Sequence, residues 1–184
     1  MLTVPNALTL LRLFAVPAFI YASFRGEYRL AFFIFVGAAV TDFFDGVIAR
    51  RFNQRSRLGA ILDPAADKTM LICGYLFYTL RQGLPVAGIP GWVTFTVFIR
   101  DFFIIALAYL LYTRIRVKRF PPSWAGKTST VIQAVTLGTA IAANAFGPAL
   151  LPFLEILFRI VVFATLYSAC DYLRKGKGML VTNP

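Results

Sequence analysis

The sequence predicts an all-α integral membrane protein with six transmembrane helices and with both termini in the cytoplasm. Three observations lead to this prediction. Of the 184 residues, 59% are hydrophobic, and the mean hydropathy of +0.72 lies far above the range of soluble domains. Apolar runs of about 20 residues, the length needed to cross roughly 30 Å of hydrocarbon, recur along the whole chain. Basic residues gather in alternate connections between these runs.

The apolar runs follow one another with short connections, so a single membrane domain over residues 1–184 accounts for nearly the whole sequence. No small-residue cleavage site follows the first run, which is therefore expected to be a retained helix and not a signal peptide. The second and third runs flank the most charged segment of the chain. The predicted spans cover roughly residues 6–24, 29–50, 60–80, 92–113, 127–147 and 151–172.

The positive charge is unevenly distributed among the connections. Most of the 19 Lys and Arg lie after the second and fourth spans and in the tail after the sixth. Because basic connections stay in the cytoplasm, this pattern predicts cytoplasmic termini and a multi-pass protein of the inner cell membrane. The net charge of +11 is accordingly interpreted as topology and contact with anionic lipid, and not as nucleic-acid binding.

Four aspartates lie within or beside apolar runs: Asp42, Asp45, Asp63 and Asp67. A carboxylate in such a setting costs several kcal/mol unless it is paired or bound to a metal. The spacings within the two pairs are three and four residues, so each pair shares one face of its own helix. Converging carboxylates need a counter-charge, and we expect two divalent cations, Mg²⁺ or alternatively Mn²⁺.

The residues next to these aspartates suit a ligand that carries phosphate. Gly46 and Ala49 lie on the same helical stripe and let a ligand approach the backbone closely. Arg50 follows them and offers a guanidinium fork that suits a phosphate. The chain has no histidine, which excludes imidazole catalysis. Together these features indicate metal-dependent phosphoryl-group chemistry on the cytoplasmic side.

The segment from Asp42 to Asp67 reads D-x2-D-G-x2-A-R-x8-G-x3-D-x3-D, which resembles the signature of the CDP-alcohol phosphatidyltransferase family at every position. Members of this family have six membrane helices, and they transfer a phosphatidyl or related group from a CDP-linked donor to an alcohol with release of CMP. The resemblance implies that Asp42, Asp45 and Asp63 hold the metals. It makes Asp67 the catalytic base, either free or also as a metal ligand. The implied contacts to the CDP donor are Gly46, Ala49, Arg50 and Gly59.

The acceptor alcohol stays open between two compounds. Outside the signature, the pattern S-x3-K-x2-T-x2-Q from Ser123 to Gln133 resembles both phosphatidylglycerophosphate synthases and cardiolipin synthases. Their acceptors are glycerol-3-phosphate and phosphatidylglycerol, respectively. The pair Arg100-Asp101 resembles cardiolipin synthases, whereas short chains of this kind more often use glycerol-3-phosphate. The predicted acceptor contacts are Arg100, Lys127 and Arg116.

Structural and functional alternatives exist for these residues. Arg100-Asp101 could form an intrahelical ion pair that bridges to a neighbouring helix, and Lys127 could be an ordinary lysine of the membrane interface. An alternative function is a cation transporter or channel that uses the intramembrane aspartates. Their clustering around one basic connection disfavours that function. A homodimer is implied by the family resemblance alone.

Overall fold

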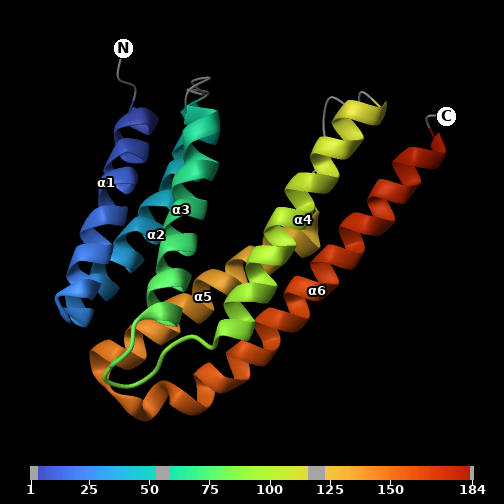
Figure 1. Cartoon of the computed structure of the whole chain (residues 1–184). Helices are drawn as coiled ribbons and strands as arrows, with labels where there is room; N and C mark the ends of the chain where they lie inside the picture. The colour runs from blue at the N-terminus through green and yellow to red at the C-terminus, as the bar shows by residue number, and fades with distance from the viewer. Residues whose placement is uncertain (1–3, 53–58, 116–122, 183–184) are drawn as a thin grey trace. The chain divides into compact units, whose positions relative to one another are not determined.

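The computed structural model describes residues 4–52, 59–115 and 123–182, and within these ranges the chain is helical and has no strand. Side chains are described for residues 13–41, 68–110, 113 and 123–175. The elements are α1 (Val4–Phe24), α2 (Tyr28–Phe52), α3 (Gly59–Leu80), α4 (Gly91–Ile115), α5 (Trp124–Phe146), the short 3-10 helix η1 (Pro148–Leu150) and α6 (Leu151–Thr182) (Figure 1).

Three helices in the described part of the chain are long and apolar enough to cross a membrane. The corresponding spans are Gly91–Leu110, Trp124–Phe146 and Pro148–Lys175. Shorter apolar helical stretches cover Leu13–Phe24 and Tyr28–Thr41. The chain is therefore a helical protein of membrane type. The number of six spans and the side on which the termini lie stay predictions.

Contacts between Cα atoms divide the chain into two compact units. Unit 1 comprises Met1–Gly88 and Leu137–Leu151, and unit 2 comprises Ile89–Thr136 and Pro152–Pro184. Helix α5 therefore contributes its first half to unit 2 and its second half to unit 1. The prediction of a single domain over residues 1–184 stays a prediction.

Unit 1 is built around α1, which packs against both α2 and α3. Phe19 of α1 is fully buried, and its ring centroid lies 6.0 Å from that of Phe35 on α2 and 6.5 Å from that of Tyr78 on α3. Close packing also joins α3 to α5, since a Cβ atom on Gly74 would lie only 2.5 Å from Cδ2 of Leu137. These contacts hold α2 and α3, the helices that carry the aspartate pairs, in one packed unit.

The connection between α3 and α4 is fastened by the side chain of Asn144 on α5. Its Oδ1 accepts hydrogen bonds from the backbone nitrogens of Val86 and Ala87, at 3.0 and 3.3 Å. Its Nδ2 donates to the carbonyl oxygens of Ala87 and Ala140, at 2.7 and 2.8 Å. The full hydrogen-bonding capacity of the amide is thus used, and one side chain satisfies the backbone of a connection that has no regular structure.

Two arginines satisfy carbonyl groups at helix ends in unit 1. Arg81 donates from Nη2 to the carbonyl oxygen of Phe24 at the end of α1 (3.4 Å). Its Cζ lies 4.6 Å from the centroid of the Phe24 ring. Arg29 donates from Nε to the carbonyl oxygen of Ala145 near the end of α5 (3.3 Å). The last carbonyls of a helix have no intrahelical partner, so these side chains stabilise the helix ends. The ends of α1 and α3 lie at the end of the unit opposite the end of α2 (Figure 1).

Candidate functional site

Helices α2 and α3 carry the two aspartate pairs. Asp42 and Asp45 lie in the second half of α2, and Asp63 and Asp67 lie in the first half of α3. The end of α2 and the beginning of α3 lie at the same end of unit 1 (Figure 1). The backbone therefore has the helical spacing that the sequence predicted. Several predicted site residues lie outside the positions whose surroundings the structure describes: the four aspartates, Gly46, Ala49, Arg50, Gly59 and Arg116.

The donor chemistry of these positions fits a divalent cation. Carboxylate oxygens are the ligands that Mg²⁺ and Mn²⁺ prefer. Separations of three and four residues on continuous helices place both members of each pair on one face. Among the side chains that the structure describes, no group of three or more His, Cys, Asp or Glu residues could hold a metal ion. The aspartates of α2 and α3 thus stay the candidate ligands.

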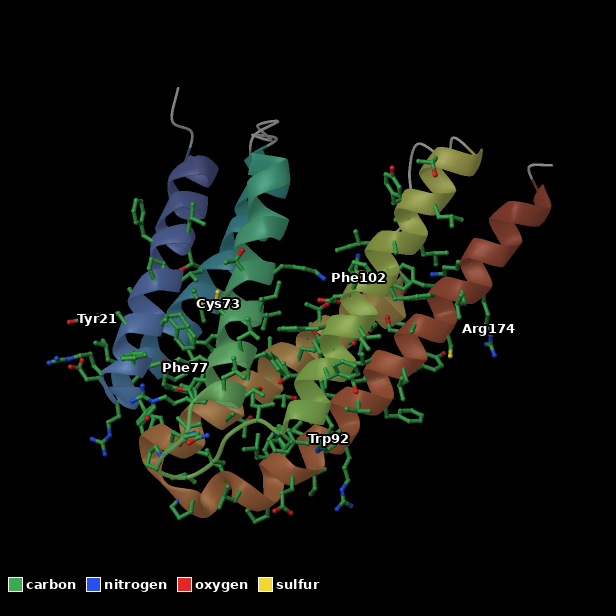
Figure 2. All side chains as sticks on the ribbon, in the orientation of Figure 1. Tyr21, Cys73, Phe77, Trp92, Phe102 and Arg174 are labelled. Atoms are coloured by element: carbon green, nitrogen blue, oxygen red, sulfur yellow. The ribbon has the colours of Figure 1, made fainter. Side chains whose placement is uncertain are left out.

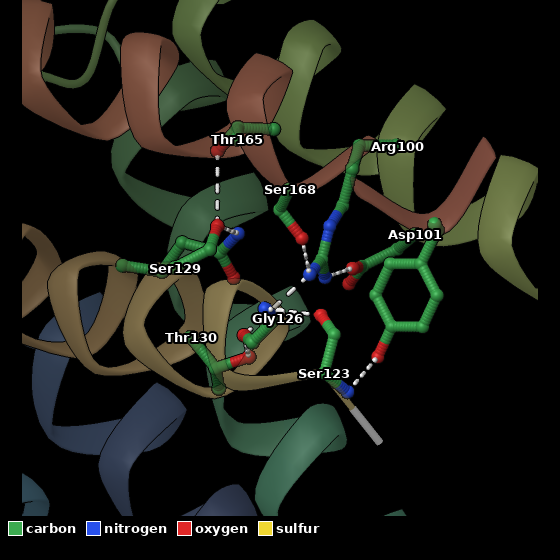
Figure 3. A network of polar contacts seen from close by, with 10 residues as sticks. Arg100, Asp101, Ser123, Gly126, Ser129, Thr130, Thr165 and Ser168 are labelled. Carbon is green, nitrogen blue, oxygen red and sulfur yellow. Dashed lines mark hydrogen bonds and ion pairs between the residues drawn. The ribbon is translucent and has the colours of Figure 1, made fainter. Parts of the chain in front are cut away.

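Arg100 lies at the centre of a polar network in unit 2 that joins α4, α5 and α6 (Figure 3). The residue is only 5% exposed. Nη1 donates to Oδ1 of Asp101 at 2.7 Å, and Nη2 donates to Oγ of Ser168 at 2.5 Å and to the carbonyl oxygen of Gly126 at 3.5 Å. The sequence allowed an intrahelical ion pair between Arg100 and Asp101 that bridges to a neighbouring helix, and the structure has this arrangement. Binding of an acceptor by Arg100 stays a prediction.

The pairing of Arg100 has energetic consequences. A guanidinium in a buried, apolar setting is tolerated only when it is paired and hydrogen-bonded. Removal of one member of a buried ion pair typically costs about 3–5 kcal/mol, because the other charge is left uncompensated. The adjacent carboxylate of Asp101 offsets the positive charge of Arg100. In this arrangement, the arginine connects three helices and is not an exposed cation.

The first turn of α5 is fixed to α6. Oγ of Ser123 accepts a hydrogen bond from the backbone nitrogen of Gly126 at 2.8 Å, which is an N-cap. The backbone nitrogen of Ser123 donates to Oη of Tyr172 on α6 at 3.2 Å. Lys127 follows in the same turn, is exposed, and has its Nζ 5.3 Å from the ring centroid of Trp124. The capped turn thus holds the start of α5 against α6 and leaves the ammonium of Lys127 at the surface.

Further polar side chains continue the contact between α5 and α6. Gln133 is buried and donates from Nε2 to Oγ of Ser129 at 3.4 Å. Oγ of Ser129 lies 3.4 Å from Oγ1 of Thr165 on α6. The sequence reasoning missed Ser129, Thr165, Ser168 and Tyr172. A signal was present, because Thr165, Ser168 and Tyr172 recur at helical spacing within an otherwise apolar helix.

These observations define a helical protein of membrane type whose aspartate signature lies on two consecutive helices. The chain belongs to the CDP-alcohol phosphatidyltransferase family, whose model it matches over residues 2–169. This match confirms the family that the signature segment predicted.

Relatives with two kinds of name are similar to the chain. The human cardiolipin synthase (CMP-forming) is 31% identical over 193 residues, which cover 95% of this chain and 62% of the relative. A probable phosphatidylglycerophosphate synthase of Mycobacterium tuberculosis is 33% identical over 178 residues, or 93% and 80% of the two chains. A Salmonella typhimurium protein named CDP-diacylglycerol--glycerol-3-phosphate 3-phosphatidyltransferase is 32% identical over 189 residues, or 97% of both. The chain thus spans less than two thirds of the human relative, and the similar identities leave the acceptor open.

Proposed function

We propose that this chain transfers a phosphatidyl group from CDP-diacylglycerol to a glycerol-type alcohol and releases CMP, as a step in the synthesis of anionic phospholipids. The observation that supports this function best is the complete signature from Asp42 to Asp67, carried by consecutive helices in a chain that the family model matches over residues 2–169. Relatives of similar identity are named for this type of transfer.

In the proposed reaction, the hydroxyl oxygen of the acceptor attacks the phosphatidyl phosphorus, and the bond from that phosphorus to the oxygen of CMP breaks. Asp67 takes the proton of the attacking hydroxyl. Asp42, Asp45 and Asp63 would hold two divalent cations, which would supply charge neutralisation at the diphosphate. Arg50 binds phosphate of the donor. The small residues that admit the nucleotide are Gly46, Ala49 and Gly59.

We further propose a multi-pass protein of the inner cell membrane with six spans, cytoplasmic termini and a cytoplasmic active site. The uneven distribution of Lys and Arg supports this topology. Three described helices that are long and apolar enough to cross a membrane support the membrane location. We propose a homodimer on the ground of the family resemblance alone.

The acceptor is either glycerol-3-phosphate or phosphatidylglycerol, and two observations favour different answers. A dianionic phosphate such as glycerol-3-phosphate is best bound by convergent cations. Arg100 is buried and paired with Asp101, whereas the ammonium of Lys127 is exposed. The ion pair between Arg100 and Asp101 favours phosphatidylglycerol as the acceptor, because the phosphodiester of this lipid carries a single negative charge. The Salmonella relative, which is named for glycerol-3-phosphate and covered over 97% of its length, favours the other acceptor.

An acceptor comparison with purified protein in detergent tests this proposal. CDP-diacylglycerol and Mg²⁺ are supplied with either glycerol-3-phosphate or phosphatidylglycerol, and both CMP and the lipid product are measured. Phosphatidylglycerophosphate or cardiolipin as the product would identify the acceptor. The Asp67→Asn variant and a chelator serve as controls, and both are expected to abolish CMP release. Cation flux in proteoliposomes without any CMP release would instead favour a transporter or channel.

A further inference from the structure

An open groove of about 430 Å³ lies between the first half of α5 and the second half of α6, within unit 2. Its two largest lining side chains are strongly exposed, with Trp124 at 82% and Tyr167 at 60%. The groove shares Ser129 with the polar contacts between α5 and α6 but contains no residue of the aspartate signature. Its lining consists of Trp124, Ala125, Thr128 and Ser129 from α5 and of Ala164, Tyr167, Asp171 and Lys175 from α6.

The groove lies at the beginning of α5 and beside charged residues of α6. Helix α5 begins at Trp124, and the apolar part of α6 gives way to the charged residues Asp171, Arg174 and Lys175. The hydrogen bond from the backbone of Ser123 to Tyr172 shows that the beginning of α5 lies beside this part of α6. In a bilayer, such a change from apolar to charged residues coincides with the lipid headgroups, where Trp and Tyr accumulate and where lysines extend their ammonium groups. The charged end of the groove is therefore expected at the depth of lipid phosphates.

The polar and apolar parts of the groove are separated along α6. Lys175, with a side chain that is 38% exposed, has its Nζ 3.3 Å from Oδ2 of Asp171. Towards the middle of α6, the lining consists of Tyr167 and of small side chains such as Ala164. The helical rise from Ala164 to Lys175 is about 16 Å, which accommodates a phospholipid headgroup and the first carbons of an acyl chain.

The charges that border the groove sum to a net positive value. The carboxylate of Asp171 offsets the ammonium of Lys175. A second ammonium, that of Lys127, lies 5.3 Å from the ring centroid of Trp124. Arg174 on α6 is also exposed. The surroundings of the polar end are thus net positive, which favours the negative phosphate of a phosphodiester lipid.

We propose that this groove binds one anionic phospholipid of the surrounding leaflet, with its phosphate at the polar end beside Trp124 and Lys175 and one acyl chain along Tyr167 and Ala164. The exposed aromatic rings and the positive charge near the end of the apolar part of α6 support this site, and it does not depend on the proposed phosphatidyl transfer. The bound lipid would be a resident of the membrane interface. It would line the surface where the first turn of α5 meets α6.

The chain has two tryptophans, which provide a matched pair of fluorescent reporters. The Trp92→Phe variant leaves Trp124 at the groove as the only tryptophan. The Trp124→Phe variant leaves Trp92, which lies at the beginning of α4, away from Arg174 (Figure 2), and is not among the residues that line the groove. Each full-length variant is reconstituted in phosphatidylcholine vesicles without CDP-diacylglycerol, so that no turnover alters the lipids. Brominated phosphatidylglycerol, phosphatidylethanolamine or phosphatidylcholine is then added as a quencher at equal mole fractions.

Quenching of Trp124 is expected to show about fivefold preference for brominated phosphatidylglycerol over brominated phosphatidylcholine, the effect of one lysine near an anionic surface. Trp92 is expected to show no such preference. In the Trp92→Phe background, Lys175→Gln should lower the preference towards one, whereas Asp171→Asn should raise it by a similar factor. Opposite shifts in these two variants could not result from misfolding alone.

Three outcomes would overturn the proposal. Equal quenching of Trp124 by all three lipids would show that the groove takes whichever lipid surrounds it. A preference for phosphatidylethanolamine would indicate a zwitterionic headgroup, with Asp171 as the partner of its ammonium. Weak quenching that strengthens when the protein is diluted in the vesicles would mean that a second copy of the chain covers the groove.

Discussion

Replacement of Gly126 by alanine is expected to destabilise the protein, because the first turn of α5 has no room for a side chain at this position. A Cβ atom there would lie 2.7 Å from Oη and 3.0 Å from Cε2 of Tyr172, and 3.2 Å from Oγ of Ser123. Tyr172 is buried, and its Oη accepts the hydrogen bond from the backbone of Ser123. Any displacement of the ring therefore also affects the start of α5.

The magnitude follows from three contributions. Insertion of a methyl group into a packed site costs about 1–3 kcal/mol. If Tyr172 moves away, the buried N–H of Ser123 loses its partner, at a cost of about 1–3 kcal/mol. The higher helix propensity of alanine offsets at most about 1 kcal/mol of this loss. The expected net loss in the free energy of unfolding is about 1–5 kcal/mol.

The assay is reversible unfolding in detergent, applied to Gly126→Ala, Tyr172→Phe and the double variant. Since Tyr172→Phe removes the oxygen at 2.7 Å, the double variant is expected to be more stable than additivity predicts, by about 1 kcal/mol or more. Gly37→Ala on α2 is the matched control, because no described atom lies within 4 Å of the added Cβ. Strict additivity, or a Gly126→Ala variant as stable as the control, would refute the reasoning.

Three further predictions concern other parts of the chain. Asp67→Asn is expected to abolish turnover with donor binding largely intact, whereas Asp42→Asn should lose metal and donor binding together; equal loss of donor affinity in both variants would contradict these roles. Arg100→Gln removes the buried guanidinium that pairs with Asp101 and donates to Ser168, so unfolding in detergent should show a loss of about 3–5 kcal/mol. A raised acceptor KM with unchanged stability would instead indicate a direct acceptor contact. Asn144→Leu removes the hydrogen bonds that fasten residues 81–90, and limited proteolysis there should accelerate at least severalfold relative to the parent chain.

The positions of the described helices were largely predictable from hydropathy, but their ends were not. The second predicted span covers residues 29–50, and the observed helix is Tyr28–Phe52. The sixth predicted span ends at residue 172, whereas α6 continues to Thr182. Hydropathy detects only the stretch that lies in hydrocarbon. A helix continues past that limit as long as its backbone hydrogen bonds are satisfied, which the apolar pattern does not report.

The local part of the candidate site was predictable, and the tertiary part was not. Helical spacing alone predicted that the signature aspartates form two pairs. In contrast, the bond from Arg100 to Ser168 joins residues 68 positions apart, and no periodicity in either helix specifies it. The residues of the pattern from Ser123 to Gln133 also have different surroundings. Ser123 caps the start of α5, whereas Lys127 is exposed at the surface.

The division of α5 between the two units has a consequence for biosynthesis. Unit 1 combines residues 1–88 with residues 137–151, so its first three helices are made long before the segment that completes their packing. The contacts of Leu137 with Gly74 and of Asn144 with residues 86–87 form only after α5 has been synthesised. Unit 2 likewise requires α6. A nascent chain that ends before residue 137 therefore has both units incomplete, and the two reach their final packing only with the arrival of the last two helices.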